Sequence, residues 1–119
     1  HLEVVKYLID KKANIEARDR QGYTPLILGS QEGQLEVVKY LIDKKANIEA
    51  RDRQGATPLI FSSIQGHFDI VKHLVDMEAN INAQTSKGYD ALHYAQKRGH
   101  SDIITFLKSN KASDCCVLL

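Results

Sequence analysis

The strongest constraint on this chain is a long segment that occurs twice without a change. LEVVKYLIDKKANIEARDRQG occupies residues 2–22 and again residues 35–55, so the copies are offset by 33 positions. A diverged copy begins at Phe68, and the first half of a fourth begins at Ser101. A fixed period of this length is typical of stacked repeats. Identical units repeat the same residues at regular spacing, whereas a catalytic site needs different residues to converge. We therefore expect a scaffold, not an enzyme.

Composition removes several other classes of protein. The 119 residues suffice for one domain, and the net charge of +1 gives no global signal for nucleic acid. No apolar run reaches the roughly 18 residues that span a bilayer. The two cysteines are adjacent, which excludes a disulfide framework and favours a reducing compartment, so we expect a cytoplasmic protein.

Each unit is predicted to hold two short helices. Apolar residues recur at helical spacing after Leu35, as they do after Leu2. Thr24-Pro25 is a helix start, because threonine caps free amide groups and proline suits the first helical position. Gly33 is suited to the left-handed residue that ends such a helix. The last unit replaces Thr-Pro by Asp90-Ala91, and aspartate can still cap.

These residues resemble the ankyrin repeat. The resemblance rests on G-x-T-P-L at residues 22–26 and 55–59, together with Gly66-His67, LEVVKYL at 35–41 and A-N-I at 46–48. It implies an all-α solenoid of helix–turn–helix units with hairpin-like connecting loops, which binds proteins without catalysis. The units are a partial repeat 1–18, repeats 19–51 and 52–84, and a more polar C-terminal capping repeat 85–113. Together they make a single domain, residues 1–113, followed by a tail at 114–119.

Two departures from the family pattern stand out. Ile27 and Ile60 occupy the place of the histidine that usually follows T-P-L, and His93 alone matches it. The glycine usual after the second helix is also missing, and the equivalent residues are Lys12, Lys45, Glu78 and Lys111. Either these residues are left-handed at a cost on the order of 1 kcal/mol each, or the helices end differently.

No motif supports a metal or a cofactor. His67 and His100 fall at the same place in their units, where capping or turn packing explains them better than ligation. There is no H-x-x-x-H or C-x-x-C spacing for zinc and no glycine-rich phosphate loop. We expect no cofactor, no metal and no catalytic residues.

The loop tips and short helices are the predicted partner-binding surface, as the resemblance implies. In the simplest alternative, the loop arginines only pair with neighbouring aspartates in a solvated loop. The expected partner of this monomer is a protein with an acidic segment. Nucleic acid is not expected, because Asp19, Asp52 and Glu32 offset the arginines, although an anion or nucleic-acid binder is an alternative. The predicted residues are Arg18, Arg20, Gln21, Tyr23, Gln31, Glu32, Arg51, Arg53, Gln54, Ala56, Ile64, Gln65, Lys87, Tyr89, Lys97 and Arg98.

The final residues predict a second alternative, a membrane tether. Cys116-Val117-Leu118-Leu119 fits the C-a-a-X prenylation pattern, and Cys115 could carry a palmitoyl group. A flexible tail would make this motif accessible. The competing interpretation is a short apolar tail that folds back onto the last helix. Membrane association is expected only if Cys116 is prenylated.

Overall fold

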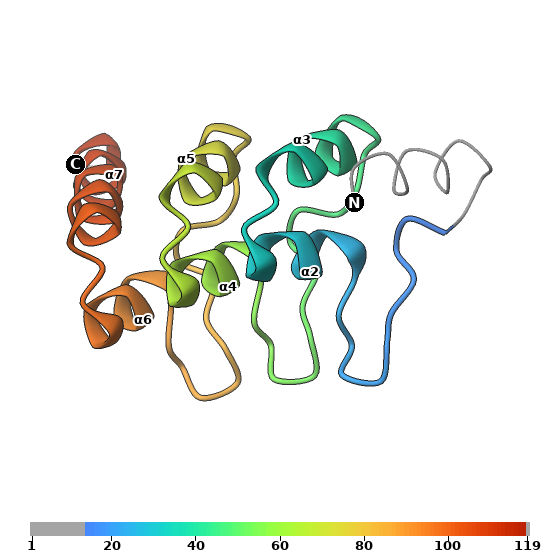
Figure 1. Ribbon diagram of the computed structural model, residues 1–119. Helices are drawn as coiled ribbons and strands as arrows, with labels where there is room; N and C mark the ends of the chain where they lie inside the picture. The colour runs from blue at the N-terminus through green and yellow to red at the C-terminus, as the bar shows by residue number, and fades with distance from the viewer. Residues whose placement is uncertain (1–13, 119) are drawn as a thin grey trace.

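The helices form a stack of antiparallel pairs. The computed structural model describes residues 14–118, and the side chains of residues 14–111. The helices α2, α4 and α6 form one layer beside the loops, and α3, α5 and α7 form the other (Figure 1). This arrangement confirms the predicted all-α solenoid. The helices are α2 Pro25–Glu32, α3 Leu35–Asp43, α4 Pro58–Gln65, α5 Phe68–Asp76, α6 Ala91–Arg98 and α7 Ser101–Leu118.

The first helix of each pair begins and ends as the sequence predicts. The Thr24 hydroxyl accepts from the Ile27 amide at 3.2 Å, and a carboxylate oxygen of Asp90 accepts from the His93 amide at 2.9 Å. Gly33 ends α2 with φ 76°, a left-handed conformation that glycine adopts without a side-chain penalty. Thr57 and Gly66 repeat the arrangement around α4.

The second helices end in two different ways. Lys45 and Glu78 follow α3 and α5 with φ of 72° and 70°, so the first of the two expected alternatives, a left-handed residue, holds at these positions. At Lys111 the second alternative holds and the helix ends differently, because this residue lies within α7. Because α7 continues beyond Lys111, the chain does not change direction at that residue. The helix predicted from Leu2 and the left-handed residue predicted at Lys12 lie outside the described residues.

The core runs through the stack from pair to pair. Ile27 and Ile60 are 0% and 1% exposed, so the position of the family histidine is an ordinary core position in these two units. His67 instead joins neighbouring units, because its Nε2 lies 3.1 Å from the carbonyl oxygen of Gln31. The His67 side chain makes no cap hydrogen bond, so turn packing is its role. His100 repeats this contact with Ile64, at 3.0 Å.

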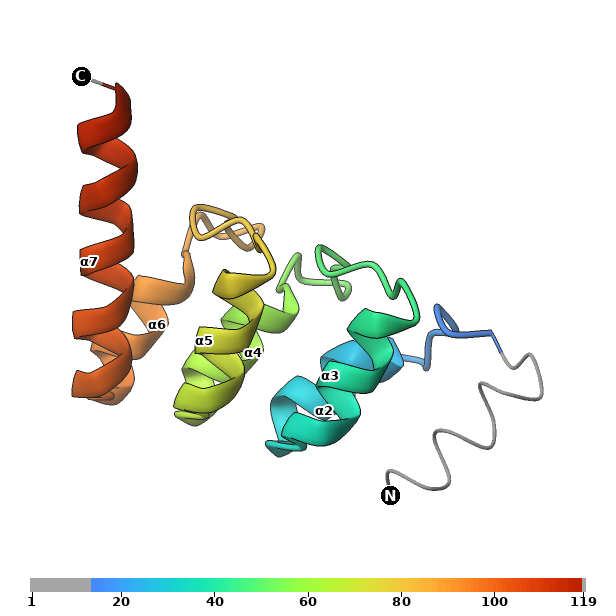
Figure 2. The same cartoon turned by 90° about the horizontal axis from the view of Figure 1, so that it is seen from above.

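In the last unit an ion pair connects α7 to the residue that precedes α6. Lys111 Nζ of α7 lies 2.5 Å from the carboxylate of Asp90, the residue that caps α6. Helix α7 continues to Leu118 and extends beyond the ends of the other helices (Figure 2). The tail from residue 114 was expected to be flexible, but its backbone is helical as far as Leu118. In the part of the chain that the structure describes, no helix has the length and apolar character needed to cross a membrane.

Candidate partner-binding groove

Each loop is fixed by one side chain at its start. A carboxylate oxygen of Asp19 accepts from the amides of Gln21 and Tyr23, both at 2.9 Å. Asp52 makes the same contacts one unit later. In the third loop the hydroxyl of Thr85 takes this role at 3.3 and 3.4 Å. Side chains that bond their own backbone in this way fix the turn, so the loops hold their shape without a partner.

Two of the predicted arginines connect successive loops. Arg18 donates to the carbonyl oxygens of Gly22 and Arg51, at 2.8 and 2.5 Å. Arg51 donates to Gly55 and Gln84 in the same way, at 2.9 and 2.7 Å. Hydrogen bonds from a charged donor are the stronger kind. These guanidinium groups are thus occupied in holding adjacent repeats together.

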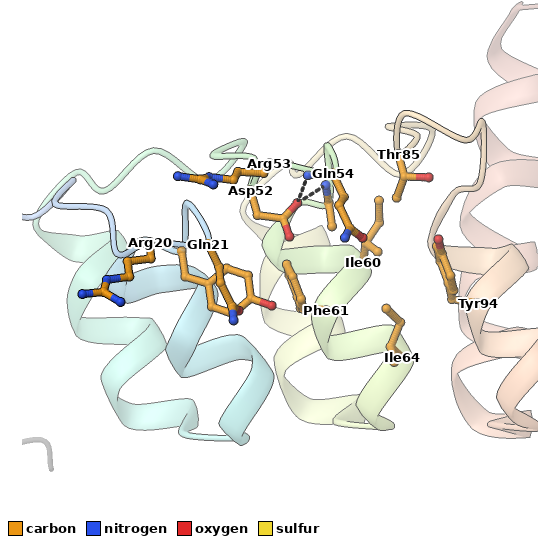
Figure 3. Close-up of a pocket in the computed structure, with 12 residues that line it drawn as sticks. Arg20, Gln21, Asp52, Arg53, Gln54, Ile60, Phe61, Ile64, Thr85 and Tyr94 are labelled. Carbon is orange, nitrogen blue, oxygen red and sulfur yellow. Dashed lines mark hydrogen bonds between the residues drawn. The ribbon is translucent and has the colours of Figure 1, made fainter.

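The side chains of the other two loop arginines make no such contacts. Arg20 and Arg53 are exposed, and neither side chain makes a hydrogen bond or ion pair with the described residues. The alternative in which they pair with Asp19 and Asp52 is not what the structure shows. The guanidinium groups of Arg20 and Arg53 both point toward the N-terminal end of the array (Figure 3).

A groove of about 400 Å³ lies between these loops and the short helices. Asp52, Gln54 and Thr85 lie along its loop side, while Ile60, Phe61 and Ile64 of α4 line it from the helix side (Figure 3). Such a mixture of apolar surface and a few polar groups is typical of binding sites. In full, the groove is lined by Arg20, Gln21, Tyr23, Asp52, Arg53, Gln54, Ala56, Ile60, Phe61, Ile64, Thr85 and Tyr94.

Three aromatic residues, Tyr23, Phe61 and Tyr94, are among those that line the groove. Tyr23 packs edge-to-face on Phe61, with ring centroids 5.2 Å apart and planes at 75°. Tyr94 contacts Tyr89 and His93 of its own unit, at 5.9 and 5.5 Å. Burial raises the pKa of the Tyr23 hydroxyl, and the carboxylates of Asp52 and Asp19 raise it further. The Tyr23 hydroxyl therefore stays protonated and can donate to an acceptor in the groove.

The groove contains part of the predicted surface. Seven predicted residues line it: Arg20, Gln21, Tyr23, Arg53, Gln54, Ala56 and Ile64. The remaining predicted residues do not, and they are Arg18, Arg51, Gln31, Glu32, Gln65, Lys87, Tyr89, Lys97 and Arg98.

Sequence reasoning missed five lining residues, which are Asp52, Ile60, Phe61, Thr85 and Tyr94. Ile60 and Phe61 are only 1% and 8% exposed, and their apolar character predicts core. A row at the 33-residue period, Leu28, Phe61 and Tyr94, could have indicated the two aromatic residues.

Two other predictions concern metal ligands and lipidation sites. Within residues 14–111, no group of three or more histidine, cysteine or acidic side chains is placed to hold a metal. The predicted lipidation sites, Cys115 and Cys116, have side chains outside the described residues.

Comparison with known proteins identifies the family. A search of curated proteins found no match. The family model described as ankyrin repeats (3 copies) matches residues 1–52 and 48–117, which is nearly the whole chain. Ankyrin repeats are generally modules for protein–protein interaction. With its helix pairs, projecting loops and matching sequence, this chain belongs to the ankyrin-repeat family.

Proposed function

We propose that this chain binds a protein partner, without catalysis, through the groove between its loop tips and short helices. The observation that carries the proposal is the different use of chemically identical arginines. The side chains of Arg18 and Arg51 make hydrogen bonds between loops, while the side chains of Arg20 and Arg53 have no hydrogen-bond or ion-pair partner among the described residues. Both of the latter border a groove that also exposes aromatic surface.

The charges of the groove favour an acidic polypeptide segment. Guanidinium groups bind carboxylates with two parallel hydrogen bonds, and neither arginine must break an existing contact to do so. Asp52 is the nearby carboxylate, but one of its oxygens already accepts from the amides of Gln54 and Ala56. Arginine and aromatic residues are the side chains that most often dominate the affinity of protein interfaces.

A selection from a random peptide library tests this proposal, because the library itself supplies the ligands. We expect the selected peptides to be enriched in Asp and Glu. Their affinity, measured by fluorescence anisotropy, should fall about tenfold or more in the variant Arg20→Ala/Arg53→Ala. The matched control is Lys39→Ala/Lys72→Ala, which removes two positive charges from the hollow between α3 and α5.

The control variant should bind within about twofold of the parent, because rim or remote charges contribute little. Circular dichroism should show equal helical content in all three proteins. Undiminished binding by the Arg20→Ala/Arg53→Ala variant would overturn the assignment of the groove. An equal loss in the control would show that only general charge attraction was measured.

A further inference from the structure

The copies of the repeated segment stop being identical at one position of the groove. Residues 2–22 and 35–55 are the same, and the next residues are Tyr23 and Ala56. The C-terminal capping repeat, residues 85–113, has Tyr89 at this place. Repeat 52–84 is therefore the unit in which a large aromatic side chain is replaced by a methyl group.

The structure shows what the tyrosine does where it is present. Tyr23 reaches across to the next unit and packs edge-to-face on Phe61 at 5.2 Å. One period later, the equivalent residues are Ala56 and Tyr94. The Ala56 methyl cannot supply a ring, so Tyr94 packs on Tyr89 and His93 of its own unit but, among the described residues, on no ring from the preceding unit. Open space is visible between Ile64 and Tyr94 (Figure 3), and Ala56, Ile64 and Tyr94 all line the groove there.

We infer that this space is a socket for an aromatic side chain of the partner, where the socket is defined by Ala56, Ile60, Ile64 and Tyr94. The inference rests on the proposed function and specifies what the groove accepts. A ring inserted over Ala56 would pack on Tyr94 as Tyr23 packs on Phe61. Edge-to-face ring pairs are favourable beyond the apolar area that they bury.

The charges around the groove set the direction of the bound segment. Arg20 and Arg53 point toward the N-terminal end of the array, whereas the socket faces α6 at the other end (Figure 3). Asp52 lies within the groove and disfavours an anionic side chain near it. The occupant is therefore a segment with its carboxylates over the arginines and its aromatic residue over Ala56.

Filling the socket from within tests the inference. In the variant Ala56→Tyr, the new ring should occupy the socket, and the melting temperature should stay equal or rise because the contact copies Tyr23 on Phe61. Library-selected peptides should bind this variant about tenfold or more weakly. Replacing the peptide's aromatic residue by alanine should weaken binding to the parent equally, but cause no further loss in Ala56→Tyr. The matched control Ala56→Ser keeps the socket open and should bind within about twofold of the parent.

The outcomes separate the socket from the groove as a whole. If Ala56→Tyr binds as well as the parent while Arg20→Ala/Arg53→Ala does not, the socket is overturned and the proposed function stands. If no variant changes binding, the socket and the proposed function of the groove are both overturned. Should Ala56→Tyr fail to fold, Tyr94→Leu replaces it, and the loss should be confined to peptides that carry the aromatic residue.

A small probe tests the socket without any selected peptide. Titration of the parent with N-acetyl-tyrosinamide should shift the NMR amide signals of Ala56, Ile64 and Tyr94, and these shifts should be absent in Ala56→Tyr. Equal shifts in both proteins, or none in the parent, would overturn the socket.

Discussion

The guanidinium group of Arg51 donates a hydrogen bond to the carbonyl oxygen of Gln84, 2.7 Å away in the next repeat. Two residues further on, the guanidinium group of Arg53 makes no such contact with the described residues. The two side chains have the same chemistry and lie in the same loop, yet one joins the repeats and the other is available to a partner.

This difference predicts that the two alanine variants change the stability by unequal amounts. Arg51→Ala should lower the free energy of unfolding by about 1 kcal/mol, because it removes the bonds to Gly55 and Gln84. Arg53→Ala should change it by less than about 0.5 kcal/mol, as is usual for a free surface side chain. Urea unfolding measures both values. Equal destabilisation would contradict the division of roles.

The left-handed residues after α3 and α5 are sites where the array can be stabilised. Lys45 and Glu78 have φ near 70°, which costs energy for any residue with a Cβ atom. Lys45→Gly and Glu78→Gly should each raise the free energy of unfolding by about 0.5–1 kcal/mol. Lys111→Gly is the internal control and should destabilise, since Lys111 is helical and pairs with Asp90. A lower unfolding midpoint for Lys45→Gly would show that the lysine is not strained.

Two buried serines should be replaceable by alanine with a gain in stability. Within the described residues, the hydroxyl groups of Ser30 and Ser63 are buried and have no hydrogen-bond partner. A buried polar group without a partner is unfavourable, and alanine is also the better helix former. Ser63→Ala should therefore raise the free energy of unfolding by about 0.5–1 kcal/mol.

The neighbouring residue provides the control for that variant. The Ser62 hydroxyl donates to the carbonyl oxygens of Pro58 and Leu59, at 3.1 Å in each case. Ser62→Ala loses these bonds and should show a smaller gain than Ser63→Ala in thermal unfolding. The reverse order would show that the Ser63 hydroxyl has found a partner, for example an ordered water.

The ion pair between Lys111 and Asp90 makes the stability of the fold depend on pH. Burial alone would raise the pKa of Asp90, but the hydrogen bond from Lys111, the amide of His93 and the lysine charge together lower it from its ordinary value of 3.8. The unfolded chain therefore binds a proton at a higher pH than the folded chain does. The stability from charged Asp90 is complete above the unfolded pKa and is lost as the pH falls through the folded pKa.

Asp90→Asn isolates this contribution, because asparagine keeps the cap on α6 and removes the titrating group. The parent should be the more stable protein at pH 7, and the gap should close toward pH 2 when both are unfolded in urea. Lys111→Met should show a similar loss at pH 7. A gap that stays constant over this range would exclude the ion pair as its cause.

Much of the fold could be predicted from the sequence because its signals are local. Thr24, Thr57 and Asp90 cap the helices that follow them, and Gly33 ends one of these helices through its own backbone freedom. Lys45 and Glu78 are left-handed at the positions where the period predicts a helix end. The repeat period alone does not predict the structure at Lys111, because there α7 continues and the lysine pairs with Asp90.

The binding groove could be predicted only in part, because its form depends on contacts between units. The sequence by itself determined the repeat, the helix pairs and the face that carries the loops. It could not distinguish Arg18 from Arg20, since both are exposed loop arginines and only the carbonyl of Arg51 in the next unit separates their roles. The tertiary structure likewise decided that Ala56 and Tyr94, which come from different units, line the same groove. Stacking brings together side chains that are more than 30 residues apart in the sequence. A local sequence pattern cannot predict which of these side chains fill the space between two units and which leave it open.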